Sequence, residues 1–112
     1  MKKEVIGLTE KVVLEHKGTA IMVKARIDTG ARYSSIDTAL AEKLGLIHTE
    51  KKVRIRAAAG KQQRHTAHAS LSIHGRKIKS LFTITDRSHM KYHVLIGTRT
   101  LKGRFLIDPE MK

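Results

Sequence analysis

The tripeptide Asp28-Thr29-Gly30 is the place in this sequence where residue types and spacing most clearly suggest chemistry. It follows an alternating stretch that ends at Ile27, so a strand would deliver the Asp28 carboxylate at its end. A small hydroxyl residue comes next, and the glycine lets the backbone turn tightly and approach a second backbone. A carboxylate held in this way can exchange protons with a substrate. Taken alone, however, the tripeptide is more commonly a turn in which the aspartate accepts backbone N–H groups.

The other titratable residues offer weaker candidates. Asp37 is expected to cap a helix, Asp86 to form a turn or an ion pair with Arg87, and Asp108 to form a turn before Pro109. The absence of cysteine excludes disulfides, cysteine-based zinc sites and a thiol nucleophile.

The seven histidines do not have the spacing of metal ligands. His65 and His68 are three apart and would lie on opposite faces of a strand. His89 and His93 would align only on a helix, but the apolar run 94–96 predicts a strand directly after them. The sequence therefore gives zinc no support, and we expect no metal and no cofactor.

The elements that must position Asp28 are mostly strands. Apolar and polar residues alternate over 21–27, 53–57, 67–73 and 78–84, and short apolar runs at 94–96 and 105–107 predict buried strands. His74-Gly75 is typical of a hairpin turn. One helix is expected to begin at Asp37 or Thr38 and end before Gly45, with a further helical turn at 98–102. We predict a single domain over residues 1–112, all-β, forming a small closed or half-closed barrel with one short helix.

Charge narrows the range of partners. Twenty-three Lys and Arg against ten Asp and Glu give a net charge of +13, which attracts polyanions. No apolar stretch approaches the ~20 residues of a membrane span, so we expect a soluble, cytoplasmic protein with no membrane partner. Two Phe, two Tyr and no Trp leave few aromatics for base stacking, so specific nucleic-acid binding ranks below binding of an acidic peptide.

The order of motifs along the chain supplies a context for the tripeptide. Ile27-Asp28-Thr29-Gly30-Ala31 is followed by Ser34-Ser35-Ile36, by the helical segment 39–46 and, near the C-terminus, by Val94-Leu95-Ile96-Gly97. Over residues 8–109 this order resembles the retropepsin-like aspartic proteases. Segments 85–92 and 94–108 look like one bacterial and archaeal branch, labelled ATP-dependent zinc proteases and often found beside the ligase that adds glutamates to a ribosomal protein.

The sequence differs from that branch at two positions, and it lacks the motifs for ATP and zinc that the name of the branch implies. A Pro usually stands at the position of His93 and an Arg often at that of Thr98, so an arginine that contacts substrate is missing here. The chain has neither a glycine-rich loop ending in Lys-Ser/Thr for ATP nor a His-Glu-x-x-His motif for zinc. We therefore expect aspartic chemistry and not metal chemistry.

The resemblance implies an aspartic endopeptidase. Such an enzyme needs two carboxylates that share a proton and activate a water, and a single Asp-Thr-Gly supplies only one. A homodimer would pair Asp28 with its symmetry mate, with Thr29 bonding across the axis and Gly30 permitting the close approach. The hairpin between the strands at Val53 and Leu71, with residues 57–60 near its tip, would be a flap that closes over the substrate. The expected substrate-binding residues lie on the loop and the flap: Ala31, Arg54, Arg56, Ala58, Ala59 and Gly60.

The basic segment Lys51–Arg56 would rim this cleft with positive charge, so a glutamate-rich peptide is the substrate that fits it. Two alternatives from other classes remain. A catalytically silent binding module would be monomeric at working concentrations, because a lone aspartate forms no dyad. A basic ribosome- or RNA-associated protein would bind RNA in a salt-sensitive way that is indifferent to Asp28.

Overall fold

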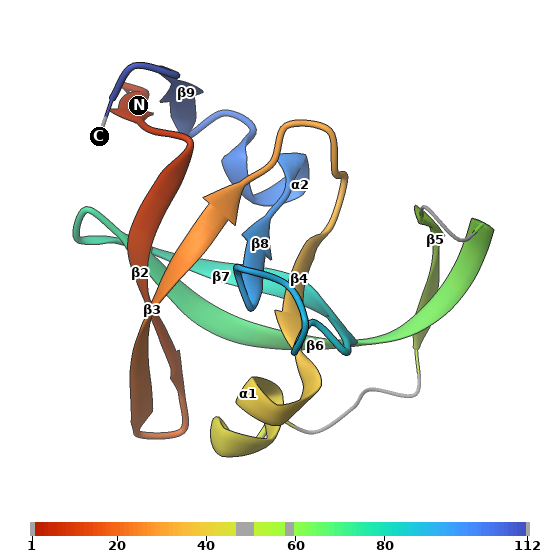
Figure 1. The fold of residues 1–112 in the computed structure, drawn as a ribbon. Helices are drawn as coiled ribbons and strands as arrows, with labels where there is room; N and C mark the ends of the chain where they lie inside the picture. The colour runs from red at the N-terminus through yellow and green to blue at the C-terminus, as the bar shows by residue number, and fades with distance from the viewer. Residues whose placement is uncertain (1, 47–50, 58–59, 112) are drawn as a thin grey trace.

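Strands close into a small barrel in the part of the chain that this computed structural model describes, residues 2–46, 51–57 and 60–111. The neighbours around the barrel are β2 (Thr9–His16), β3 (Thr19–Ile27), β8 (Val94–Ile96), β4 (Ser34–Asp37), β7 (Arg76–Thr85) and β6 (Gly60–Ile73). β6 returns to pair with β2, which closes the ring (Figure 1). The β3–β8 and β4–β7 pairs are parallel and the others antiparallel. The predicted all-β barrel is confirmed.

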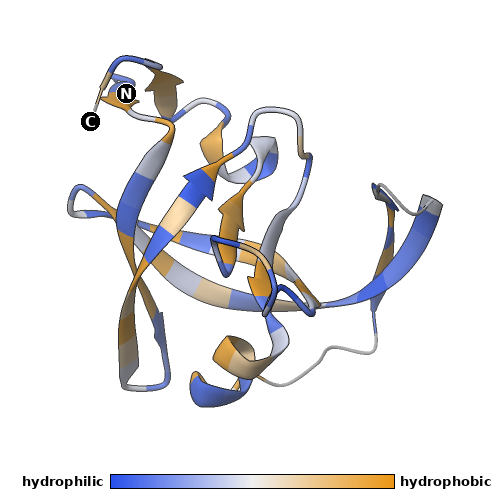
Figure 2. Cartoon of the chain, in the orientation of Figure 1, coloured by the Kyte–Doolittle hydropathy of each residue, from blue (hydrophilic) through white to orange (hydrophobic). Residues whose placement is uncertain are grey.

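The period of two explains which side chains form the core. Along β7, Ile78, Ser80 and Phe82 are buried, while Lys77 and Lys79 are exposed and Leu81 is half-buried. The same alternation buries Ala25 and Ile27 at the end of β3. Figure 2 shows hydrophobic and hydrophilic residues alternating along the long strands of the wall. Among the described residues the buried core is largely aliphatic, with Phe82 and Phe105 as its aromatic members.

The two short helices begin and end where local signals predict. α1 (Thr38–Lys43) has Asp37 as its N-cap, whose Oδ2 accepts a hydrogen bond from the Ala39 N–H at 3.2 Å. Gly45 follows the helix with φ of +70°, the left-handed conformation that suits glycine. α2 (Thr98–Leu101) is the predicted second turn. Neither of these helices is long and apolar enough to cross a membrane.

A hairpin extends from the barrel wall. β5 (Lys52–Ala57) pairs with residues 60–65 of β6, whereas residues 66–73 of the same strand pair with β7. Figure 1 shows this hairpin arching away from the barrel on the side opposite the termini, and Figure 2 shows its β6 half as hydrophilic. We call β5 and residues 60–65 the flap. The predicted hairpin is present, but its second strand begins at Gly60, and the predicted strand 67–73 belongs to the barrel wall. Ala58 and Ala59 lie outside the described residues.

The chain ends form a separate two-stranded sheet. β1 (Glu4–Ile6) pairs in parallel with β9 (Phe105–Ile107), so the two termini lie side by side (Figure 1). The sheet and its surroundings expose four large apolar side chains, which we call the terminal patch: Val5, Leu8, Leu106 and Met111. Of these, Leu106 is 52% exposed and is the register partner of Val5. The backbone oxygen of Leu8 accepts a hydrogen bond from the Ile27 N–H at 2.9 Å, so the patch adjoins the end of β3.

Candidate active site

Asp28 occupies the first position after β3, at the start of a loop over residues 28–33 that we call the Asp28 loop. Its backbone N–H donates to the Ile96 carbonyl at 2.9 Å, which continues the pairing of β3 with β8. One carboxylate oxygen, Oδ1, accepts the Gly30 N–H at 2.9 Å. The carboxylate is half-buried and thus held in a defined direction by its own loop.

Gly97 braces this loop from the other side. A Cβ on Gly97 would lie 2.6 Å from the Tyr33 carbonyl oxygen and 2.8 Å from that of Ala31, so only glycine permits this approach of two backbones. The next residue, Thr98, donates its N–H to the Ala31 oxygen at 2.8 Å. The apolar-apolar-glycine segment therefore supports the Asp28 loop through close backbone packing at Gly97 and the hydrogen bond from Thr98.

Beneath the loop runs a chain of buried hydroxyl groups. Ser34 Oγ accepts the Gly97 N–H at 3.0 Å and is hydrogen-bonded to Thr100 Oγ1 at 2.7 Å. Thr100 Oγ1 is in turn 2.7 Å from Ser80 Oγ on β7. The chain ties the loop, α2 and the barrel wall together, and a fully satisfied network of this kind rigidifies its surroundings. Sequence reasoning missed it, because three separate small hydroxyl residues have no recognisable spacing.

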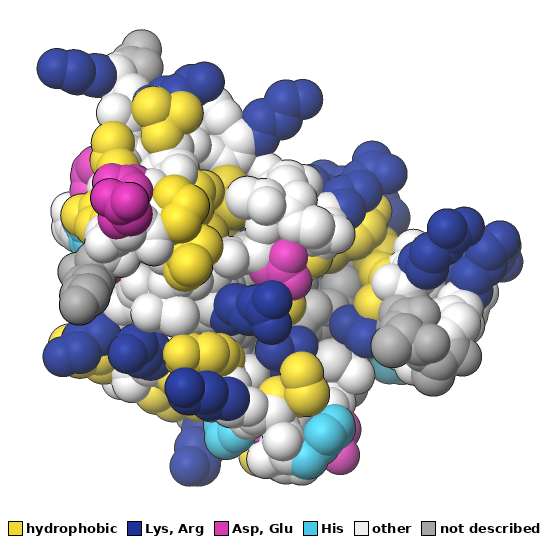
Figure 3. Space-filling view, turned by 45° about the horizontal axis from the view of Figure 1, so that its top comes forward, with side chains coloured by type: hydrophobic (Ala, Val, Ile, Leu, Met, Phe, Trp, Pro, Cys, Tyr) yellow, Lys and Arg dark blue, Asp and Glu magenta, His cyan; other side chains and the backbone are white. Residues whose placement is uncertain are grey.

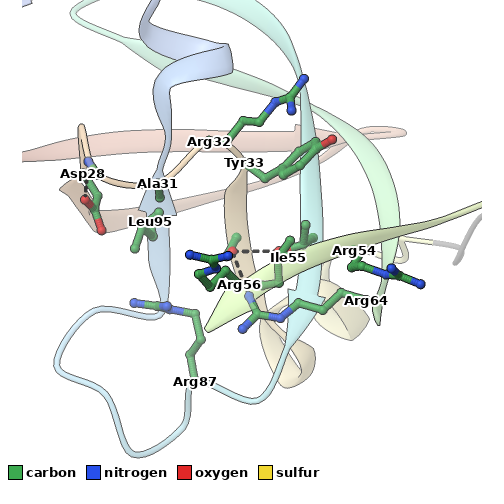
Figure 4. A pocket seen from close by; sticks show the side chains of 13 residues that line it. Asp28, Ala31, Arg32, Tyr33, Arg54, Ile55, Arg56, Arg64, Arg87 and Leu95 are labelled. Atoms are coloured by element: carbon green, nitrogen blue, oxygen red, sulfur yellow. Dashed lines mark hydrogen bonds between the residues drawn. The ribbon is translucent and has the colours of Figure 1, made fainter. Parts of the chain in front are cut away.

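A pocket of about 550 Å³ opens between the Asp28 loop and the flap (Figure 4). Its lining carries five arginines and a single acidic residue, Asp28. The lining residues are Asp28, Gly30, Ala31, Arg32, Tyr33, Ser35, Arg54, Ile55, Arg56, Arg64, Thr83, Arg87 and Leu95. Figure 3 shows Lys and Arg side chains spread over this face of the molecule and gathered on the flap. The pocket is therefore suited to a ligand that carries negative charge.

Two of these arginines, Arg64 and Arg87, are at least partly buried. Burial, and then the charge of Arg87, lowers the pKa of Arg64. Burial, followed by the charge of Arg26, lowers the pKa of Arg87, and the negative charges of Asp28 and Asp37 act in the opposite direction. Arg87 is only 9% exposed. The interior wall of the pocket is thus positively charged at a place where water screens charge poorly.

The structure brings most, but not all, of the predicted site residues together. Asp28, Gly30, Ala31, Arg54 and Arg56 line the pocket. Thr29 is exposed next to Asp28, and Gly60 is exposed at the flap; neither belongs to the lining. Figure 4 shows Arg56 pointing toward the centre of the pocket and Arg54 at the side far from Asp28. The lining residues that the sequence did not single out include Arg32, Tyr33, Arg64 and Arg87.

The remaining carboxylates have local partners. Asp37 caps α1 as predicted, and its Oδ1 also accepts the Arg87 N–H at 2.7 Å. Asp86 Oδ1 accepts the N–H and the hydroxyl of Ser88, at 2.9 and 2.6 Å, so Asp86 forms the turn that was one of its two expected roles. These bonds from Ser88 lower the pKa of Asp86. Among the described residues, no three His, Asp or Glu side chains gather as metal ligands would.

A closed β-barrel with a hairpin flap over an Asp-Thr-Gly loop, braced by an apolar-apolar-glycine segment, defines the retropepsin-like class of aspartyl protease folds. The sequence model of the family described as "gag-polyprotein putative aspartyl protease" matches residues 16–103. The chain therefore belongs to this family. No curated protein sequence matches it.

Solved structures agree with the fold. A protein of unknown function from Legionella pneumophila superposes with a TM-score of 0.71 at 16% identity, covering 99% of this chain and 97% of its own. The EIAV protease, in complex with the inhibitor HBY-793, gives 0.65 at 20% identity over 89% of this chain and 91% of its own. The simian foamy virus protease gives 0.55 at 21% identity over 81% and 90%. At these identities the likeness concerns the fold alone.

Proposed function

We propose that the protein is an aspartic endopeptidase in which Asp28 and the same residue of a second copy form the catalytic dyad. The observation that carries the proposal is the placement of the Asp28 carboxylate at the edge of a large pocket, under a flap and on a braced loop. Asp28 is the sole acid of the described lining, so the second carboxylate must come from another chain.

The reaction follows from the chemistry of two facing carboxylates that share one proton. The ionised carboxylate takes a proton from a water, whose oxygen attacks the peptide carbonyl carbon. The protonated partner stabilises the carbonyl oxygen as charge develops there. A proton then passes to the amide nitrogen, the C–N bond breaks, and an acid and an amine leave.

Two surface features support the dimer. Thr29 and Gly30 are exposed beside the half-buried Asp28, where they could meet a symmetry mate. The terminal patch adjoins this loop through the hydrogen bond between Leu8 and Ile27. A second copy placed on this face would bring the two Asp28 loops together and bury the apolar side chains of the patch, which favours association.

The arginine-rich lining supports an acidic peptide as substrate. A glutamate-rich segment would offer several carboxylates to a pocket that has five guanidinium groups. A glutamate-rich substrate is also consistent with the branch that segments 85–92 and 94–108 resemble, which is often found beside a glutamate ligase. We place the chain in that branch by resemblance and assign it aspartic chemistry.

Substitution of Asp28 by Asn tests the proposal. Initial rates of cleavage of glutamate-rich peptides across pH should fall on the order of 10³-fold or more in Asp28→Asn. Asp86→Asn serves as the matched control, because it removes an exposed aspartate that lies outside the pocket lining. Full activity of Asp28→Asn would refute the proposal. If both proteins bind the peptide as dimers and neither cleaves it, a binding module is the correct function.

A further inference from the structure

Two arginines from different elements line the same pocket, and the charge of Arg87 acts on Arg64. Arg64 belongs to the flap half of β6, and Arg87 follows the end of β7. Figure 4 shows the Arg64 guanidinium group near the centre of the pocket and the Arg87 guanidinium group directed toward the side on which Asp28 lies. We call these two residues the arginine pair.

Hydrogen bonds within the protein hold both arginines in place but do not use all of their N–H donors. Arg87 Nε donates to the Tyr92 carbonyl at 3.0 Å, and no described residue accepts a hydrogen bond from its two terminal nitrogens. Arg64 is held by Gln62 Oε1, at 3.2 and 3.1 Å from Nε and Nη2, and by Ser35 Oγ at 3.4 Å from Nη1. A guanidinium group has five N–H donors, so donors remain that face the pocket.

The electrostatic situation of the arginine pair calls for an anion. No described carboxylate lies within ion-pair distance of either guanidinium group, and burial, followed by the positive charge of Arg87, lowers the pKa of Arg64. Partly buried cations without a counter-charge are costly. An anion that binds between them would relieve the repulsion and form charge-assisted hydrogen bonds with both.

The position of the arginine pair selects the kind of anion. Asp28 lines the same pocket and its negative charge acts on Arg87. A singly charged group is repelled less by that carboxylate than a phosphate dianion. The two oxygens of a carboxylate can each accept from one guanidinium group. Arg56 points to the same centre from the flap (Figure 4), so closure of the flap would add a third guanidinium group over the ligand.

We propose that Arg64 and Arg87 form a carboxylate subsite that fixes one acidic group of a bound peptide at a set distance from Asp28. The inference rests on the proposed peptidase function and deepens it. The basic rim would attract any acidic peptide, whereas the subsite would select an acidic group at one position of the substrate. The acidic group is either an Asp or Glu side chain or the C-terminal α-carboxylate of the peptide.

The subsite is tested by binding, which needs no catalysis. Calorimetry with Asp28→Asn would use neutral peptides in which a single Glu is moved along the sequence, each paired with its Gln counterpart. Each peptide is made as a C-terminal acid and as an amide. At one position, Glu should bind about 10- to 100-fold more tightly than Gln, as expected for hydrogen bonds to a charged group. A preference only for the acid over the amide would identify the α-carboxylate as the ligand.

Variants assign the preference to the arginine pair. In Arg64→Gln on the Asp28→Asn background, the Glu preference should fall to within about threefold, whereas Lys24→Gln should keep it. Lys24 is exposed on β3 and lies outside the pocket lining, so its variant makes the same change in net charge. Arg87→Lys repeats the test with the charge retained and the planar fork lost, and should also weaken the preference. Circular dichroism and thermal unfolding verify that each variant is folded.

The outcomes separate the subsite from the peptidase. Equal binding of every Glu and Gln pair, or a Glu preference that survives Arg64→Gln, would overturn the subsite. Asp28-dependent cleavage of neutral peptides by the otherwise wild-type protein would leave the proposed function standing in that case. A Glu preference that depends on Arg64, without any cleavage, would overturn the peptidase and retain the subsite.

Discussion

A single methyl group added at Gly97 tests how the Asp28 loop is held. The Cβ of Gly97→Ala would lie 2.6 Å from the Tyr33 oxygen and 2.8 Å from the Ala31 oxygen, where ordinary contact begins at 3.4 Å. Both atoms are backbone, so no side chain can rotate away. The Asp28 loop must move by several tenths of an ångström, and the hydrogen bond from the Thr98 N–H to the Ala31 oxygen must stretch.

The size of the effect follows from overpacking of a well-packed region. Such changes cost about 1–3 kcal/mol of unfolding free energy, which lowers Tm by roughly 4–12 °C for a chain of this length. A displaced Asp28 would also lower kcat by on the order of 10- to 100-fold, because a shift near 1 Å at a reacting group costs about 10²-fold. Thermal unfolding, cleavage rates and hydrogen exchange of the Thr98 amide measure the three consequences.

Gly18→Ala is the control for lost stability. Gly18 has φ of +85° in the β2–β3 turn, with no atom near its Cβ position and no place in the pocket lining. Alanine there costs about 1–2 kcal/mol through its backbone conformation alone and should leave kcat unchanged. If Gly97→Ala keeps the Tm and Thr98 exchange of the wild type, or loses no more kcat than Gly18→Ala, the bracing role is refuted.

Two further predictions concern polar contacts. Protonated His74 bridges Glu4 and Glu10 at 2.7 and 2.8 Å, and chiefly the hydrogen bond to Glu10 raises the pKa of His74. Its stabilisation is complete below the unfolded-state pKa of about 6.5 and is lost as pH rises through the higher folded-state pKa. His74→Asn should therefore lower Tm at pH 6 and progressively less above it; a pH-independent deficit would contradict this. Thr100→Val should lower the free energy of unfolding, measured with denaturant, by about 1–3 kcal/mol, because Ser34 loses its partner hydroxyl. Thr100→Ser keeps a hydroxyl and should lower it much less. Equal losses in the two variants would exclude the hydroxyl chain as the cause.

The long strands of the barrel wall that sequence reasoning found have one buried and one more exposed face. In β3, β6 and β7 every second side chain over part of the strand is buried or half-buried, so the alternation is visible in the sequence. β2 was missed, because the apolar run Val12-Val13-Leu14 interrupts the alternation, although β2 closes the barrel against β6. β4 follows no pattern, since all four of its residues are buried and three of them are polar.

The site divides in a similar way. Asp28 can be found from sequence because its loop is a local structure with a recognisable tripeptide. Arg87 cannot, because its neighbour Asp86 suggested an ion pair, whereas Asp86 is satisfied by Ser88 and the Arg87 side chain turns inward. Arg64 reaches Ser35, 29 residues away, and only the pairing of β6 with β7 and of β7 with β4 brings the two together.

The shared strand β6 constrains how members of such a family can diverge in length. Residues 60–65 of β6 belong to the flap and residues 66–73 to the barrel wall, with no loop between them. One residue inserted at this junction would exchange the two faces of the flap half, because strand side chains alternate, and Arg64 would leave the pocket. The tip of the hairpin carries no such constraint. Flaps in this architecture should therefore lengthen or shorten at the tip, and tolerate changes at the junction in steps of two.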